Sequence, residues 1–237
     1  MKKLYFYMLS LAVALGMASC NDSHDHLTDS TITYYPEFHM LGNEFEEVFL
    51  GTSYTDAGCT ATLLGEDWTS QIVTTGLEDI DVNVPGLYYV TYSITNKDGY
   101  VKSVTRTVAV FDPEITTDIS GKYETQEGTF LQHSGGKIAL DGFTVNIERV
   151  VPGVFFIDEM LAGMWSQRAG YGSDYGLQGY LQLTADNHLH DLGVMVPGWG
   201  DTYDEISDII YNPETGEITY QMVYAGYLFN VILNKAK

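Results

Sequence analysis

The chain has 237 residues, a formal net charge of −21 at pH 7, and 45% hydrophobic and 13% aromatic residues. This hydrophobic content excludes disorder as the default state and predicts one or two domains with sizeable cores. The negative charge excludes nucleic acid as a partner, because such binding depends on neutralising phosphates, and it also repels bare anionic lipid.

Residues 1–19 have the composition of a secretory signal peptide. Lys2 and Lys3 open the chain, an uncharged run rich in Leu, Ala and Met covers 4–18, and small residues precede Cys20. These are the marks of a cleaved signal, and the apolar run is shorter than the about 20 residues of a membrane span. Cleavage removes two lysines and no acid, which leaves a charge of −23.

Residues 17–20 (MASC) resemble the lipobox of a bacterial lipoprotein signal, with Met where Leu is usual. The resemblance implies that Cys20 carries lipid, and several acyl chains together make a stable anchor. The polar, acidic tract 21–26 is similar to the export signal of Bacteroidetes surface lipoproteins, which implies an outer-membrane protein exposed on the cell surface. Residues 20–31 are then an acidic tether. The alternatives are placement in the inner leaflet and an ordinary secreted protein with a chance cysteine.

The second cysteine, Cys59, has no partner in the chain once Cys20 is acylated. It alternates with polar neighbours in the segment DAGCTATL, which favours a small core residue on a strand. A reactive thiol is the alternative, but no basic neighbour is present to lower the pKa of Cys59.

Residues 86–112 predict a β-hairpin. Alternate residues Tyr88, Val90, Tyr92 and Ile94 share one face, and residues 96–99 (NKDG) form the turn. The second strand ends before Pro113, because proline cannot continue a central strand. We assign this hairpin to a first β unit at residues 32–112.

This first unit resembles the Ig-like repeat of bacterial surface proteins. The matching segments are a Y-x-D-x-G motif, a G-x-Y-x-V-x-Y strand and an R-x-V-x-V-x-D end. Here they comprise Tyr54, Asp56 and Gly58, then Gly86, Tyr88, Val90 and Tyr92, then Arg106, Val108, Val110 and Asp112. The resemblance implies a β-sandwich without the antibody-type disulfide, used as a spacer.

After a short linker at residues 113–118, a second all-β unit covers 119–237. Alternation is clear in residues 143–148 (FTVNIE), and turns fall at 186–187, 212–216 and 225–226. Short consecutive strands with brief turns predict an antiparallel barrel or sandwich, with a lipocalin-like barrel as the alternative. The predicted fold class is therefore all-β throughout.

The sequence predicts neither an enzyme nor a cofactor. Acidic pairs such as Asp158 with Glu159 are expected by chance among 32 acids, and neighbours on a strand point to opposite faces. The best metal candidates are His188 and His190, which share a strand face, but a third ligand is not evident. The acids of residues 201–208 lack the spacing of a calcium loop.

Residues 160–181 are dense in glycine and aromatics, and PGWGDTY follows at 197–203. Aromatic faces on glycine-rich loops are suited to stacking on sugar rings. The candidate ligand-binding residues are Trp165, Tyr171, Tyr175, Trp199 and Tyr203. The alternative is that these aromatics fill the end of a barrel.

Signal, Ig-like unit and distal β unit together resemble the architecture of SusE/SusF-type accessory lipoproteins of bacterial glycan utilisation. The resemblance implies a non-catalytic surface protein that binds a neutral oligosaccharide and works beside an outer-membrane transporter or another lipoprotein. It implies contact with the membrane through the lipid anchor alone. A second hypothesis is a structural or assembly subunit that docks a protein through its C-terminal domain, and a third is a metal-assisted hydrolase.

Overall fold

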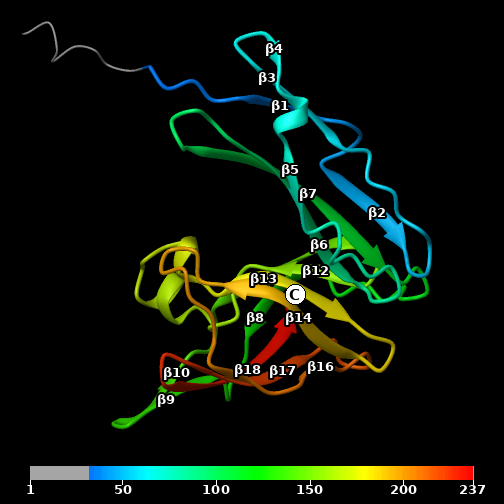
Figure 1. The fold of residues 1–237 in the computed structure, drawn as a ribbon. Helices are drawn as coiled ribbons and strands as arrows, with labels where there is room; N and C mark the ends of the chain where they lie inside the picture. The colour runs from blue at the N-terminus through cyan, green and yellow to red at the C-terminus, as the bar shows by residue number, and fades with distance from the viewer. Residues whose placement is uncertain (1–31, 237) are drawn as a thin grey trace, which may run out of the picture.

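The computed structural model describes residues 32–236, which form two β-rich units (Figure 1). The expected signal peptide, Cys20 and the tether lie outside these residues. Within residues 32–236 no helix has both the length and the apolar character needed to cross a membrane.

The N-terminal unit contains β1 (Glu37–Met40), β2 (Phe45–Phe49), β3 (Cys59–Leu63), β4 (Glu66–Asp67), η2 (Thr69–Gln71), β5 (Val73–Thr75), β6 (Gly86–Thr95) and β7 (Val101–Phe111). The first part of the C-terminal unit contains β8 (Gly121–Thr125), β9 (Phe130–His133), β10 (Gly136–Ala139), β11 (Thr144–Val151), β12 (Val154–Ile157), η3 (Met164–Arg168), η4 (Ser173–Tyr175) and β13 (Gln178–Leu183). It ends with β14 (His188–Met195), β15 (Glu205–Ile206), β16 (Ile209–Tyr211), β17 (Ile218–Tyr224) and β18 (Tyr227–Lys235).

The N-terminal unit has two sheets, ordered β1-β3-β4 and β2-β7-β6-β5. Strand β2 runs parallel to β7, whereas β6 and β7 form the long antiparallel hairpin predicted from alternation. Val90, Tyr92, Val108 and Val110 form its core, because alternate residues of β6 and β7 point to the same side. Cys59 is half-buried against this core, as expected for a small core residue.

The motif residues of the Ig-like resemblance meet around one buried arginine. Arg106 is fully buried, and its guanidinium pairs with Asp56 and donates to the backbone carbonyl of Asn43 at 3.0 Å. The Tyr92 hydroxyl donates to the same carboxylate at 2.6 Å, and the Gly58 amide donates to it at 3.1 Å. The motif spacing therefore encodes a structural network in this unit.

The C-terminal unit is a closed barrel. Eight strands follow in the order β8-β11-β12-β13-β14-β16-β17-β18, and β18 pairs with β8, so the first strand meets the last. Closure removes exposed edges in this ring, and the hairpin β9–β10 and the short β15 extend the sheet beyond it. Of the two predicted architectures, the structure is the barrel, and the all-β fold class is confirmed.

Side chains fill the barrel. In β17 and β18 the inward residues alternate with outward ones, and Tyr123, Phe155 and Phe229 are fully buried in the interior. The β17–β18 turn places Ala225 and Gly226 both at positive φ, which is the two-residue turn that suits the twist of a hairpin.

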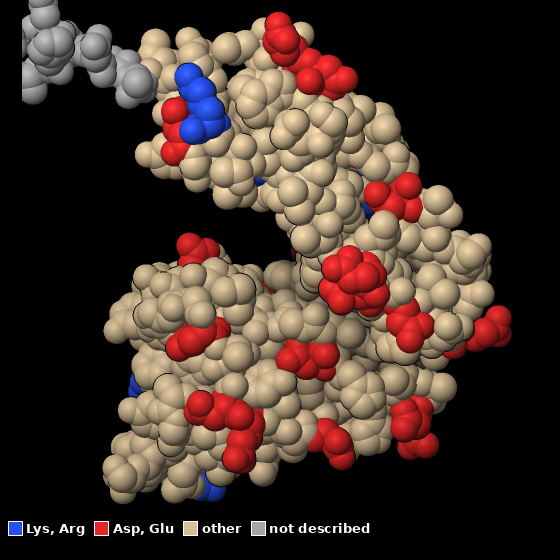
Figure 2. Space-filling model, in the orientation of Figure 1, with Lys and Arg blue, Asp and Glu red and all other residues tan. Residues whose placement is uncertain are grey.

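An apolar contact joins the two units. Ala109 and Phe111 of β7 are buried with Val151 and Val154 of the barrel, and Leu87 and Leu192 pack around them. Figure 2 shows the two units meeting on one side, with a deep indentation between them on the other. The segment 113–118 runs beside this contact and is mostly exposed, although Ile115 packs on the barrel.

Candidate functional site

Three connections bring aromatic residues together at one end of the barrel. They are the long segment 158–177 between β12 and β13, the loop 196–204 between β14 and β15, and the β17–β18 turn. Loops at the end of a rigid barrel are where binding groups concentrate in such folds. The backbone amide of Gly198 donates to the carbonyl of Asp174 at 2.7 Å and ties the first two connections together.

The rings form a continuous group, here named the aromatic cluster, with Trp199 at its centre. The ring centroid of Trp199 lies 5.0 Å from that of Tyr175, 5.9 Å from Trp165 and 6.3 Å from Tyr171. It also stacks at 6.4 Å and 24° on a tyrosine of the β17–β18 hairpin, and a second tyrosine of that hairpin lies 6.4 Å from Trp165. The cluster comprises Trp165, Tyr171, Tyr175, Trp199, Tyr224 and Tyr227.

Exposure divides the cluster into a surface and a base. Tyr171 is 57% exposed, Trp199 44% and Tyr227 36%, so these three present ring surface to solvent. Tyr224 is buried, and Trp165 is half-buried against the barrel core. The indole N–H of Trp165 is nevertheless buried without a hydrogen-bond acceptor among residues 32–236. A buried donor without a partner is costly, and this N–H is also shielded from solvent.

Local backbone features hold the aromatic segments in place. Residues Met164–Arg168 form the π-helix η3, a rare element that is often found at functional sites. The side-chain amide of Gln167 clamps η3 to the barrel, since it donates to the Thr144 carbonyl at 2.6 Å and accepts from the Thr144 amide at 3.0 Å. At residue 198, a side chain would begin 2.7 Å from the Tyr175 ring, so only glycine permits this approach.

Glu159 lies beneath this segment and is almost completely buried. Its carboxylate accepts a hydrogen bond from the Leu161 amide at 2.7 Å and one from the Ser166 hydroxyl. Burial raises the pKa of Glu159 to about 7, although these two hydrogen bonds act in the opposite direction. No basic side chain of residues 32–236 forms an ion pair with it. The neighbouring Asp158 instead accepts from Asn146, so the two acids do not face a common point.

Two acidic residues of the segment 201–208 form hydrogen bonds with the β17–β18 hairpin next to the aromatic cluster. Asp201 accepts a hydrogen bond from the Tyr224 hydroxyl at 2.8 Å, and Asp204 accepts one from the Gly226 amide at 3.3 Å. Burial, followed by the nearby Asp201 carboxylate, raises the pKa of Tyr224. These contacts fix the hairpin against the loop that carries Trp199.

Tyr203 lies apart from the other predicted ligand-binding residues. Its ring packs on the barrel core, and its hydroxyl donates to Asp191 at 2.7 Å. Burial and this carboxylate raise the pKa of Tyr203 to about 12. His188 and His190 lie nearby on β14, but residues 32–236 hold no group of three or more side chains arranged to bind a metal ion.

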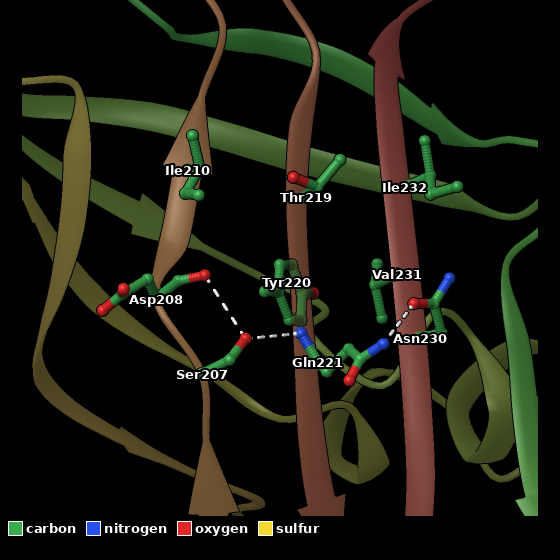
Figure 3. A pocket seen from close by; sticks show the side chains of 9 residues that line it. All are labelled: Ser207, Asp208, Ile210, Thr219, Tyr220, Gln221, Asn230, Val231 and Ile232. Atoms are coloured by element: carbon green, nitrogen blue, oxygen red, sulfur yellow. Dashed lines mark hydrogen bonds between the residues drawn. The ribbon is translucent and has the colours of Figure 1, made fainter.

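A hollow of about 310 Å³, with a mixed polar and apolar lining, lies on the outer wall of the barrel (Figure 3). The Gln221 amide group donates to Asn230 at 3.0 Å, and the Gln221 backbone amide donates to the Ser207 hydroxyl at 2.9 Å. Because these polar groups already pair with one another, the hollow is a weaker candidate site than the aromatic cluster.

Four of the five predicted ligand-binding residues therefore meet: Trp165, Tyr171, Tyr175 and Trp199. The sequence reasoning missed Tyr224 and Tyr227, which complete the cluster. They flank the turn at Ala225 and Gly226, and two tyrosines on either side of a tight turn are the signal that could have identified them.

The fold and the matching sequence models define the class of this protein. A model of the bacterial surface protein Ig-like domain matches residues 38–110, and a second family model, described as a C-terminal domain, matches residues 112–235. Comparison with curated proteins gives no match. The first model therefore covers most of the N-terminal unit, and the second covers the β-barrel.

One solved structure identifies the family. The lipoprotein BT2262 from Bacteroides thetaiotaomicron is 34% identical to this chain. The match covers 85% of this chain and 100% of the lipoprotein, with a TM-score of 0.48. The chain belongs to the family of this Bacteroides lipoprotein.

Two matches are to parts of a Clostridium perfringens protein, ZmpB. One comprises an M60 catalytic domain with two CBM51 domains (16% identity, 53% of this chain, 14% of that chain, TM-score 0.28). The other is CBM51-2 in complex with GlcNAc, with INT domains (18% identity, 52% of this chain, 29% of that chain, TM-score 0.27). At these scores the likeness establishes neither a shared fold nor a shared ligand.

Proposed function

We propose that this protein is a lipid-anchored surface protein that binds a neutral oligosaccharide at the aromatic cluster. The observation that carries the proposal is the convergence of three exposed rings, from three separate connections, in one cluster at the end of the barrel. Ring faces stack on the C–H face of a sugar. The net charge of −21 disfavours acidic polysaccharides.

The proposal includes anchoring through Cys20, with residues 20–31 as a tether to the outer membrane and the folded units outside the cell. Membership in a lipoprotein family supports the anchor, and the Ig-like match supports the surface location. No catalytic step is proposed, because Asp158 and Glu159 have separate partners and do not form an acid–base pair facing one point.

Calorimetry against a panel of neutral oligosaccharides tests the ligand. Trp199→Ala and Tyr171→Ala should each weaken binding several-fold, since stacking contributes about 0.5–1.5 kcal/mol per aromatic beyond burial. Tyr100→Ala, which removes an equally exposed tyrosine from the Ig-like unit, should leave the affinity unchanged.

Two outcomes would favour the second hypothesis, a subunit that docks a protein through the same surface. One is that no neutral glycan binds at millimolar concentration although the protein is folded. The other is that Trp199→Ala unfolds the barrel, which would make this residue part of the core. The exposed Met195, on the strand that leads to the Trp199 loop, supplies further apolar surface for such a partner.

A further inference from the structure

A second exposed aromatic surface lies on the N-terminal unit, beside the first described residues. It is formed by the tip of the β6–β7 hairpin and the first described residues. Tyr100 is 55% exposed and Val101 63%, and they lie where the turn after β6 ends and β7 begins. We name this surface the hairpin-tip patch; its residues are Ile32, Tyr34, Tyr35, Lys97, Tyr100, Val101 and Lys102.

Hydrogen bonds hold the patch in one arrangement. Asn96 is buried at the hairpin turn, and its side-chain amide donates to the Tyr34 carbonyl at 3.0 Å. The side-chain oxygen of Asn96 accepts from the backbone amides of Asp98 and Tyr100, at 3.0 and 2.9 Å. The Tyr35 and Tyr100 rings then lie 6.2 Å apart. The exposed rings are therefore positioned by the fold.

The charge of the patch differs from that of the chain as a whole. The chain has 32 acidic and only 11 basic residues, yet Lys97 and Lys102 both belong to this hairpin tip, with Asp98 as the one acid of the turn. Figure 2 shows basic side chains, with acidic ones directly beside them, near the first described residues. Tyrosine and lysine side chains combine apolar bodies with polar ends, which suits them to the lipid–water interface.

The patch lies close in sequence to the proposed lipid anchor on Cys20, and this position favours the membrane as its partner. Twelve residues, 20–31, separate Cys20 from Ile32, and this length reaches at most about 40 Å when fully extended. We propose that the hairpin-tip patch rests on the headgroups of the membrane that holds the lipid on Cys20. This inference depends on the proposed anchor but not on the oligosaccharide.

Because the lipid on Cys20 holds the domain at the membrane, even a weak contact between the hairpin-tip patch and the headgroups is enough to orient it. A protein of this charge would be repelled from an anionic bilayer when free, but an anchored domain meets the headgroups at a high effective concentration. The patch then selects which side of the Ig-like unit faces the lipid. Residues elsewhere on the acidic surface remain turned away from the bilayer.

Hydrogen exchange of the lipidated protein in phosphatidylcholine–phosphatidylglycerol vesicles tests the inference. The reference is the mature chain carrying Cys20→Ala in buffer. Peptides covering residues 96–103 should exchange several-fold more slowly on the vesicles, whereas the turn at 212–216 should be unaffected. The triple variant Tyr35→Ser, Tyr100→Ser, Val101→Ser should lose this protection, and Tyr171→Ser, a matched exposed tyrosine of the barrel, should retain it.

The outcomes separate the two proposals. If mass spectrometry of the protein purified for this experiment finds no lipid on Cys20, the anchor is wrong and the inference falls with it. If the chain partitions with the vesicles but residues 96–103 exchange as in buffer, the anchor stands and the patch does not contact lipid. Protection that survives the triple substitution also overturns the assignment to these side chains.

Discussion

Arg106 explains why the residues of the Ig-like sequence pattern occur together, because several of them contact its side chain. Its guanidinium is completely buried, and two segments distant in sequence supply three of its partners: the carbonyl of Asn43, and the carboxylate of Asp56 with the carbonyl of Gly58. Removing one member of such a network leaves the remaining groups buried without partners, which is far more unfavourable than losing an exposed ion pair.

Arg106→Met should therefore lower the free energy of unfolding by about 3–5 kcal/mol, measured by urea denaturation. The matched control is Arg149→Met, because Arg149 forms an exposed pair with Asp118 at 3.6 Å. That change should reduce stability by less than about 1 kcal/mol. Equal losses in the two variants would contradict a structural role for the buried network.

Glu159 links stability to pH in the direction set by its raised pKa. The folded protein holds a proton on Glu159 up to about pH 7, whereas the unfolded chain releases it near the ordinary glutamate pKa of 4.5. The unfolded state then binds fewer protons between these values, so the free energy of unfolding contributed by this group falls as pH rises from about 4.5 to about 7. Below 4.5 and above 7 the contribution is constant.

Glu159→Gln should remove this dependence. Glutamine can still accept from the Leu161 amide and reach Ser166, but it carries no charge to desolvate. Relative to the unsubstituted protein, the variant should gain roughly 3 kcal/mol between pH 5 and pH 8. Chemical denaturation at both pH values measures the gain, and a difference independent of pH would show that Glu159 is ionised in the fold.

At the scale of elements, the loop 196–204 depends on the absence of a side chain at residue 198. Gly198→Ala should displace the Tyr175 ring, weaken its contact with Trp199 and change the near-ultraviolet circular dichroism of the aromatic cluster. The effect should vanish in the background Tyr175→Ala, because the ring that the methyl group meets is gone. Additive effects of the two substitutions would contradict this steric explanation.

The sequence predicted the elements better than their assembly. Alternation identified β6, β7, β17 and β18, because period-two burial is a local property of each strand. It left barrel and sandwich open, because closure depends on the pairing of β18 with β8, which no local pattern encodes.

The candidate site was predicted in the same partial way. Glycine-rich context identified Trp165 and Trp199, but alternation also made Tyr224 and Tyr227 look like ordinary strand residues. Tyr203 shares the local composition of the Trp199 loop and yet turns to Asp191, because which residues meet across loops is decided by tertiary packing.

At the scale of the whole molecule, the apolar contact between the units fixes their relative placement. Leu192→Asp would place a charge against Phe111 and Val154, which is unfavourable in a buried apolar cluster. Small-angle scattering should show a larger radius of gyration, while circular dichroism stays unchanged. Met195→Asp, on the same strand but exposed, should change neither measurement.

The boundary at residues 113–118 should be the first site of proteolytic cleavage, since this segment is largely exposed and lies between the strands β7 and β8. After cleavage the two fragments should elute together from a sizing column in native buffer, because the apolar contact remains. First cuts within residues 123–231 would instead show that the units form one inseparable fold.

Closure of the barrel by its last strand has a consequence for how the protein is made. The Thr129 hydroxyl bonds to the Ile232 carbonyl across 103 residues, and β18 contacts β8, β9 and β17 together. The ring cannot form until residues 227–235 have emerged from the ribosome, because these residues form β18, the strand that closes it. The barrel stays open until then, and a chain truncated before residue 227 leaves β8, β9 and β17 without the strand that joins them.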